Sequence, residues 1–203
     1  MIEEHNILIA SVGGQGGITL SRIISRAALI QGLRARVGET LGMAQRGGSV
    51  QSHVRLGESV RGPLIPERGS DVLISLEPAE ALRVARYIGK RTTIIMNTAP
   101  HLPISVVLGE AEYPDIEEIR NILKKLGERV VSFDAMGLAE EAGSPRSLNI
   151  VLLGAYMSLE EPVLTLEAVK EAMATSMPSR FLKQNTKALE MGMEKMNELI
   201  TGL

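Results

Sequence analysis

The chain has 203 residues, of which 44% are hydrophobic, and a formal net charge of −2, a composition that fits one domain with a sizeable core. Acids and bases nearly balance, and the only aromatic residues are three tyrosines and two phenylalanines. This argues against a nucleic-acid-binding protein, which needs basic patches and aromatic stacking platforms. No apolar run reaches the roughly 18 residues that span a membrane. The acidic start MIEEHN is unlike the basic start of a signal peptide, so we expect a cytoplasmic protein.

Cysteine is absent from the sequence. This absence excludes disulfides, thiolate catalysis and an iron–sulfur cluster held by this chain's own thiolates. The three histidines, His5, His53 and His101, do not follow a metal-binding spacing. The sequence therefore shows no self-contained catalytic centre, and any redox chemistry would require a partner that carries the electrons.

The first elements in the chain predict a strand, a helix and a second strand. Residues 6–12 form a short apolar run bounded by glycine, which is typical of a buried parallel strand. Residues 16–31 carry apolar side chains at helical spacing, and residues 34–39 fit a second strand. A strand, helix and strand within about 30 residues form a βαβ unit, whose crossover should be right-handed.

The next segment alternates apolar and polar residues over 50–56, and Gly57-Glu58 supplies a turn. This pattern predicts a β-hairpin or an edge extension inserted after the βαβ unit.

The remaining segments alternate between strands and helices before becoming helical. The pattern predicts strands over 71–76, 92–98 and 129–135, and helices over 77–88, 115–126, 134–142, 147–158, 165–175 and 179–201. Such alternation indicates a three-layer α/β/α fold, Rossmann-like, with a mainly parallel sheet and the inserted hairpin. We expect a single domain over 1–203, with a C-terminal helical segment from about residue 160 to 203.

Two glycine-rich segments are candidates for ligand binding. A glycine turn lets a ligand approach the backbone, and the N–H groups at a helix N-terminus bind phosphate. The second segment adds an arginine, whose planar fork suits phosphate. The candidate binding residues are Gly13, Gly14, Gln15, Gly16 and Gly17 in the first segment and Arg46, Gly47, Gly48 and Ser49 in the second.

Besides a simple phosphate site, two interpretations of the first segment remain open and one is excluded. A dinucleotide fingerprint needs a glycine where this chain has Ser11, although Glu39 follows at about the position of the ribose-binding acid. A nucleotide-binding P-loop is excluded, because no Lys-Ser or Lys-Thr pair follows the glycines. The glycines could instead serve close packing of the helix on the strand.

Four blocks in this order along the chain resemble the gamma-type subunits of 2-oxoacid:ferredoxin oxidoreductases, and most closely the beta subunits of indolepyruvate ferredoxin oxidoreductases. The resemblance continues into the last helix, at FLKQNTKALEMG. One departure is Ser11, where such subunits often have glycine. The four blocks are GGQG at 13–16, MAQRGGSVQSHVRLG at 43–57, PLIPERGSDVLISLEPAEALR at 63–83 and SLNIVLLGA at 147–155.

The resemblance implies a thiamine-diphosphate enzyme that oxidatively decarboxylates an aryl 2-oxoacid, passes the acyl group to coenzyme A and reduces ferredoxin through iron–sulfur clusters. This chain lacks cysteine and also lacks the GDG pattern that holds magnesium and diphosphate in such enzymes. Thiamine diphosphate, Mg and the clusters are therefore expected on a larger alpha subunit. This chain would be inert alone and could bind coenzyme A at the glycine loop.

Two rival functions and a self-association remain open from the sequence. The chain could be a free-standing NAD-dependent oxidoreductase, although a complete fingerprint and a proton donor are missing. It could also be a non-catalytic assembly module whose loop binds nothing. In isolation it could form a homo-oligomer through the surface that a partner normally covers.

Overall fold

The structure, a computed structural model, describes residues 2–42, 47–160 and 162–202. Its centre is a six-stranded sheet with the strand order β2-β3-β1-β4-β5-β6. Strand β3 is antiparallel to both of its neighbours, whereas β1, β4, β5 and β6 are mutually parallel. The strands are β1 (His5–Val12), β2 (Ala35–Leu41), β3 (Ser49–Leu56), β4 (Ser70–Ser75), β5 (Ile88–Asn97) and β6 (Arg129–Phe133).

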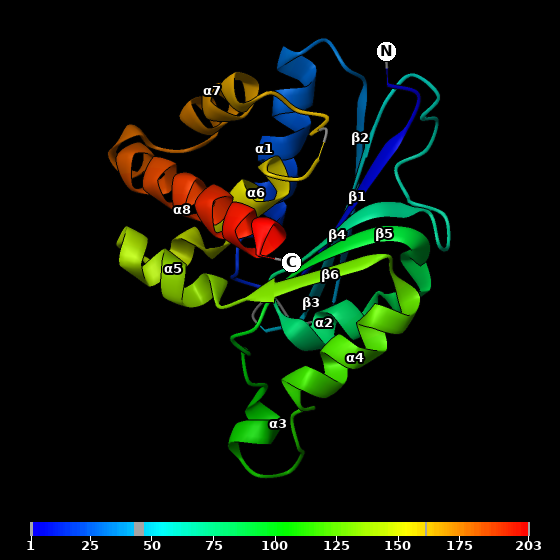
Figure 1. Cartoon of the computed structure of the whole chain (residues 1–203), viewed down its shortest axis with the longest axis vertical. Coiled ribbons are helices and arrows are strands. Elements are labelled where there is room, and N and C mark those ends of the chain that lie inside the picture. The colour runs from blue at the N-terminus through cyan, green and yellow to red at the C-terminus, as the bar shows by residue number, and fades with distance from the viewer. Residues whose placement is uncertain (1, 43–46, 161, 203) are drawn as a thin grey trace.

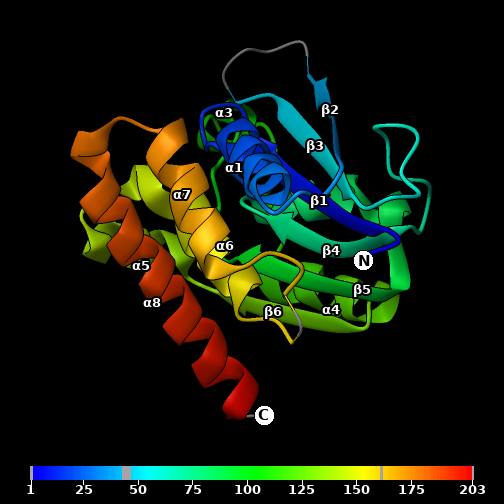
Figure 2. The ribbon, with the colours of Figure 1, turned by 90° about the horizontal axis from the view of Figure 1, so that it is seen from above.

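Helices cover both faces of this sheet (Figure 1). Seen from above, α1, α6, α7 and α8 lie on one side of the strands (Figure 2), and α2 and α4 pack on the other. The α-helices are α1 (Gly17–Ile30), α2 (Pro78–Arg83), α3 (Ile104–Val107), α4 (Ile116–Leu126), α5 (Ala135–Ala142), α6 (Leu148–Met157), α7 (Leu166–Ser176) and α8 (Leu182–Thr201). Three short 3₁₀ turns are η1 (Ala85–Tyr87), η2 (Pro145–Ser147) and η3 (Ser179–Phe181).

Alternation along the strands explains the three layers. In β1, Ile7 and Ile9 face the larger cluster with α1 and α6, whereas Leu8 and Ala10 face the cluster with α2 and α4. Both sets are fully buried, as expected for a strand covered on both sides. The prediction of a three-layer α/β fold with a mainly parallel sheet is confirmed.

The inserted hairpin lies elsewhere than the sequence predicts. It is formed by β2 and β3, and β3 inserts between β1 and β2 instead of extending an edge. Its alternating residues Val54 and Leu56 are buried under α1, so burial on the α1 face stabilises the inner position. The predicted turn at Gly57-Glu58 does not close a hairpin, because the next strand, β4, begins only at Ser70.

The helix predicted over 77–88 was too long. It ends at Arg83, a 3₁₀ turn follows, and β5 already begins at Ile88. A side chain on Gly89 would overlap the carbonyl oxygen of Arg68, and the Gly89 N–H donates to Thr92 Oγ1 (2.8 Å). The close approach of two backbones therefore keeps this segment extended. Helix α3 was not predicted.

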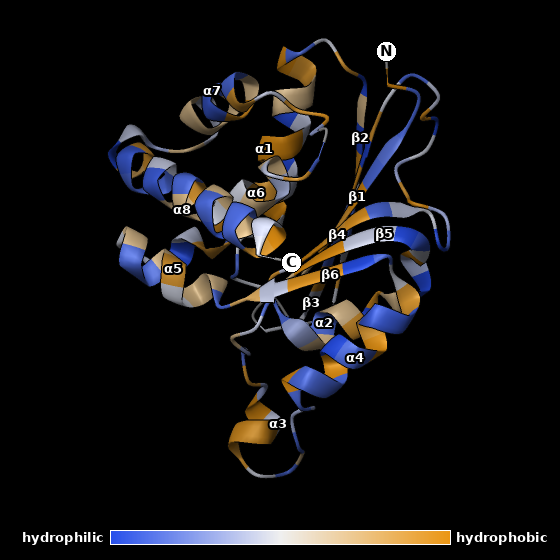
Figure 3. Ribbon diagram, viewed as in Figure 1, coloured by the Kyte–Doolittle hydropathy of each residue, from blue (hydrophilic) through white to orange (hydrophobic). Residues whose placement is uncertain are grey.

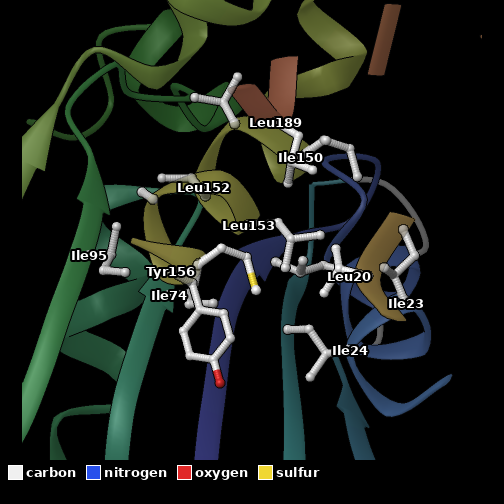
Figure 4. Packing of buried hydrophobic residues seen from close by; sticks show 14 of the residues in the cluster. Leu20, Ile23, Ile24, Ile74, Ile95, Ile150, Leu152, Leu153, Tyr156 and Leu189 are labelled. Carbon is white, nitrogen blue, oxygen red and sulfur yellow. The ribbon is translucent and has the colours of Figure 1, made fainter. Parts of the chain in front are cut away.

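Helix α6 is the centre of the larger cluster, because all ten of its residues are buried. Figure 4 shows Leu153 and Tyr156 of α6 close to Leu20 and Ile24 of α1. Burial raises the pKa of the Tyr156 hydroxyl, which is within 3.3 Å of the Nε2 atom of His5 at the start of β1.

Helices α6 and α8 cross at two glycines. A side chain on Gly154 would overlap the carbonyl oxygen of Leu189, and one on Gly192 would overlap that of Val151. Only glycine permits this backbone-to-backbone approach. The crossing attaches the long C-terminal helix to the buried helix.

We expect Gly154→Ala to lower the free energy of unfolding by about 1–3 kcal/mol, because the added methyl group forces the two helices apart. Gly62 serves as the control, since its added Cβ would meet no atom within 4 Å. Urea denaturation of the two variants measures the difference. Equal stabilities would contradict the tight crossing.

His53 is a buried titratable group in β3 and packs edge-on against the Tyr87 ring at 4.9 Å between centroids. Its Nδ1 atom accepts from the Ile65 N–H (3.3 Å). Its Nε2 atom has no partner among the described residues. Burial, with the nearby Arg86 and Arg55, lowers the pKa of His53 from 6.5 to about 4.

This lowered pKa predicts acid sensitivity. Between pH 6.5 and about 4 the unfolded chain binds a proton at His53 that the folded chain resists, so stability falls as the pH falls. The loss is at most about 1.4 kcal/mol per pH unit from this one group. Urea denaturation between pH 7 and pH 4 should show a shallower pH dependence for His53→Gln, and an unchanged slope would contradict the assignment.

Candidate functional site

The glycine loop lies at the edge of the sheet where the parallel strands end. After β1 the chain turns into α1 on one face, and after β4 it turns into α2 on the opposite face. The crevice between such strands is where open α/β sheets bind ligands. The first predicted segment therefore occupies the position that this class of fold uses for binding.

The two predicted segments meet through their backbones. The Gly13 N–H donates to the Gly48 carbonyl oxygen (2.8 Å), and the Gly47 N–H donates to the Gly13 carbonyl oxygen (3.4 Å). Gly16 adopts φ 88° and begins α1 with no side-chain cap. The N–H groups of the first helical turn therefore lack a side-chain acceptor among the described residues, a local preference for an anion.

Three glycines of the loop have different physical roles. Gly14 has φ +105°, and a Cβ there would meet no atom within 4 Å. Gly16 has φ +88° and would press on the Asn149 amide, whereas a side chain on Gly17 would overlap the hydroxyl of Ser11. Close packing therefore explains Gly17, while Gly14 leaves open space over the backbone.

Gln15 supports the loop from within. Its Oε1 atom accepts from the Val12 N–H (3.0 Å), and its Nε2 atom donates to the Leu76 carbonyl oxygen at the end of β4 (3.4 Å). Asn149 of α6 donates from Nδ2 to the Gly16 carbonyl oxygen (3.0 Å). Gln15 therefore positions the loop, while the second N–H of its amide remains available and the residue also lines the hollow toward α6. That Gln15 contacts a ligand stays a prediction.

Two small hollows meet at the loop. One has a volume of about 270 Å³ and lies toward β3, and the other has about 220 Å³ and lies toward α6 and η3. The first is lined by Ser11, Val12, Gly13, Gly14, Gly16, Gly17, Ile18, Thr19 and Val50. The second is lined by Gly14, Gln15, Gly16, Thr19, Arg146, Asn149, Ile150, Met177, Phe181 and Asn185.

Arg146 is a candidate that the sequence analysis missed. It is exposed, lines the second hollow, and has no carboxylate within 4 Å among the described residues. The sequence pattern does not point to Arg146, because it is about 130 residues from the glycines and only the folding of α6 beside α1 brings them together. It supplies a cation next to the uncapped helix terminus.

Ser49 does not face the loop. Its hydroxyl donates to Glu80 Oε2 (2.5 Å), and Glu80 belongs to α2 on the other face of the sheet. Burial raises the pKa of Glu80, although the bond from Ser49 and the Arg83 guanidinium oppose this. The prediction that Ser49 contacts a phosphate is thus not supported by its orientation, and Arg46 lies outside the described residues.

The inserted strand also bears on the dinucleotide reading. Because β3 separates β1 from β2, Glu39 lies beyond Ser52 and opposite Ile9, two strand spacings from β1, about 10 Å instead of about 5 Å. Its Oε1 atom accepts from the Ser21 hydroxyl (3.1 Å). The geometry argues against a ribose-binding role for Glu39.

The described residues include neither a metal-binding cluster nor a membrane-spanning helix. Across 2–42, 47–160 and 162–202, no three histidine or acidic side chains gather closely enough to hold a metal ion. Within the same part of the chain, no helix has the length and apolarity to cross a membrane.

The packing role of Gly17 can be tested by compensation. Gly17→Ala should lower the free energy of unfolding by about 1–3 kcal/mol, because its methyl group meets the Ser11 side chain. Ser11→Gly removes that side chain, so the double variant should recover most of the loss. Thermal unfolding of the single and double variants measures this coupling, and strictly additive losses would contradict the contact.

The comparisons with known proteins agree on one family. Residues 6–195 match the family described as Pyruvate ferredoxin/flavodoxin oxidoreductase. The indolepyruvate oxidoreductase subunit IorB of Archaeoglobus fulgidus is 47% identical over 97% of this chain and 96% of its own length.

Solved structures show the same fold. The gamma subunit of a keto/oxoacid ferredoxin oxidoreductase from Geobacter sulfurreducens is 23% identical with a TM-score of 0.70, and the match covers 95% of this chain and 98% of that one. A 2-oxoglutarate:ferredoxin oxidoreductase from Magnetococcus marinus, with 2-oxoglutarate, coenzyme A and succinyl-CoA bound, has a TM-score of 0.71 at 20% identity. That match covers 97% of this chain but 32% of the Magnetococcus chain. The chain therefore belongs to the pyruvate ferredoxin/flavodoxin oxidoreductase family, among the gamma-type subunits of 2-oxoacid:ferredoxin oxidoreductases that include IorB.

Proposed function

We propose that this subunit completes a thiamine-diphosphate-dependent oxidoreductase that converts indolepyruvate to an aryl-acetyl-CoA and reduces ferredoxin, and that its glycine loop binds coenzyme A. The observation that carries the coenzyme A proposal is the uncapped N-terminus of α1 beneath the open space at Gly14. The name of the Archaeoglobus relative supports indolepyruvate as the substrate. The coenzyme A in the Magnetococcus enzyme supports the ligand.

The loop residues fit a phosphate group of coenzyme A. Unpaired N–H groups at the start of α1 would donate to phosphate oxygens, and the absence of a side chain at Gly14 lets those oxygens approach the backbone. Arg146 lines the adjoining hollow and would add a guanidinium fork. When bound, coenzyme A supplies the thiol that accepts the acyl group.

The surrounding carboxylates do not oppose an anion at the loop. Glu77 accepts from Tyr113 and from the Glu80 N–H (3.0 Å), and Glu80 accepts from Ser49. Both acids are buried in α2 contacts. Their charges are therefore directed into hydrogen bonds on the far side of the sheet from α1.

The remaining chemistry is assigned to a larger subunit. This chain has no cysteine for iron–sulfur clusters, and its sequence lacks the GDG pattern expected for magnesium and thiamine diphosphate. We place those groups, and the electron transfer to ferredoxin, on the larger alpha subunit. The contribution of this chain is then to position coenzyme A beside the partner's reaction.

A non-catalytic assembly module is the alternative that one observation favours. Gly16 and Gly17 are both explained by contacts within the protein, with Asn149 and Ser11. At Gly14 a Cβ would meet nothing within 4 Å, so packing does not explain this glycine, although its φ of +105° also favours glycine.

Gly14→Val should raise the apparent constant for coenzyme A tenfold to a hundredfold in the assembled enzyme, with little change in the constant for the 2-oxoacid. This corresponds to about 1–3 kcal/mol of lost polar contacts. Steady-state kinetics of the complex with coenzyme A and indolepyruvate varied separately measures both constants.

Gly32→Val is the matched control, because Gly32 also has a positive φ and open space around its Cβ but lies at the far end of α1. It reproduces the backbone strain without touching the loop. If both variants change the coenzyme A constant equally, or if neither does, the loop does not bind the ligand. Arg146→Ala should act in the same direction as Gly14→Val.

The isolated chain should show no turnover. Supplied with indolepyruvate, coenzyme A, thiamine diphosphate and magnesium, it should not reduce a viologen dye, because it holds neither the clusters nor the thiamine site. Addition of the larger subunit should restore reduction. Steady dye reduction by the chain alone would contradict the assignment of the clusters and the thiamine site to the larger subunit.

A further inference from the structure

The segment between β5 and α4, residues 98–114, projects from the body of the protein and is here called the arm (Figure 1). It leaves the sheet at the same edge as the glycine loop. Its short helix α3 has no buried residue. Figure 3 shows α3 as an apolar patch at the tip of this projection.

The tip of the arm exposes large apolar side chains to an unusual degree. The exposed fractions are 46% for Leu102, 72% for Ile104, 63% for Val107 and 64% for Leu108. A single exposed apolar residue needs no explanation, but four neighbouring apolar side chains on a projection mark a contact surface.

The base of the arm is held in place by one buried carboxylate. Glu77, which is 2% exposed, accepts at Oε1 from the Tyr113 hydroxyl and from the His101 N–H (3.4 Å). The Tyr113 hydroxyl in turn accepts from the Ala79 N–H (3.2 Å). Both ends of the arm are therefore fixed on the N-terminus of α2, which presents the apolar tip outward.

The charge around the tip is acidic. Five acids lie among residues 109–118, and no lysine or arginine occurs between Arg91 and Arg120. Only Glu117 has a salt bridge among the described residues, to Arg120 (3.2 Å). A complementary partner thus presents an apolar pocket rimmed by lysine or arginine. The five acids are Glu110, Glu112, Asp115, Glu117 and Glu118.

We propose that the arm docks into the larger subunit of the same oxidoreductase, in an apolar pocket with a basic rim. The inference rests on the proposed function, which supplies that partner. It is supported by the Magnetococcus chain, in which the matching domain is 32% of a longer polypeptide and so has further protein as its neighbour. The arm also projects from the same edge of the sheet at which we place coenzyme A.

A second copy of this chain is the competing occupant. The groove between α1 and α7 combines the exposed Leu29 with Arg22 and Arg26 and has a volume of about 760 Å³. The arm of one copy could enter the groove of another, and this head-to-tail contact would form rings or filaments instead of a closed pair. Leu29→Asp in the groove is therefore the matched control for a charge introduced on the arm.

The test uses the chain co-expressed with its larger subunit. The double variant Ile104→Asp/Leu108→Asp should raise the dissociation constant of the complex at least tenfold, while Leu29→Asp leaves it unchanged. The melting temperature of the isolated double variant should match that of the wild type, because neither side chain is buried. Wild-type affinity should also fall as the salt concentration rises.

Three outcomes would overturn the proposal. The double variant could bind as tightly as the wild type, or Leu29→Asp could weaken binding as much as the arm variant does. The arm variant could also abolish only self-association of the isolated chain, which would assign the arm to a second copy. Failure of the wild-type chain to form any complex would instead count against the proposed function, so the two failures are distinguishable.

Discussion

Three strand ends are joined through the backbone N–H and carbonyl of one residue, Leu76, and the geometry of the site depends on this junction. The Leu76 N–H donates to the Ala10 carbonyl oxygen of β1 (2.8 Å). Its carbonyl oxygen accepts from Gln15 in the glycine loop (3.4 Å) and from Asn97 at the end of β5 (3.1 Å). Asn97 is fully buried and accepts at Oδ1 from the Ala135 N–H at the start of α5 (3.1 Å). The loop, the base of the arm and α5 are thereby held in fixed relative positions along one edge of the sheet.

The strand order and the packing of α6 change which groups surround the glycine loop. Insertion of β3 beside β1 displaces β2 and its acid Glu39 from the crevice, which removes the ribose contact of a dinucleotide site. The same strand brings the backbone of Gly48 against Gly13, and α6 brings Arg146 and Asn149 to the other side of the loop. What remains is a short glycine turn between two small hollows, which we propose as the site of a phosphate-bearing ligand whose other end is held by a partner.

Local patterns in the sequence predicted most of the elements, because apolar alternation and helical spacing are local properties. They could not place β3 inside the sheet, since strand order is decided by which faces become buried after collapse. The position of the glycine loop between β1 and α1 follows from the sequence, whereas the hydrogen bonds of its side chains depend on the fold, and ligand binding by these residues stays a prediction. The Gln15 amide forms hydrogen bonds with Val12 and Leu76, and the Ser49 hydroxyl donates to Glu80. Arg146 joins the site only through the packing of α6 on α1, a long-range contact that no local pattern encodes.

If the N-terminus of α1 and the glycine loop form a preformed site for coenzyme A, the ligand should bind there in the isolated chain. Titration of the isolated, ¹⁵N-labelled chain with coenzyme A, followed through its backbone amide resonances, tests it most directly. We expect saturable shifts that are largest for the amides of residues 13–19, with smaller shifts at 146–149 where the second hollow begins. Absence of saturable shifts at the loop, or shifts concentrated at another surface, would show that the glycine loop does not bind coenzyme A.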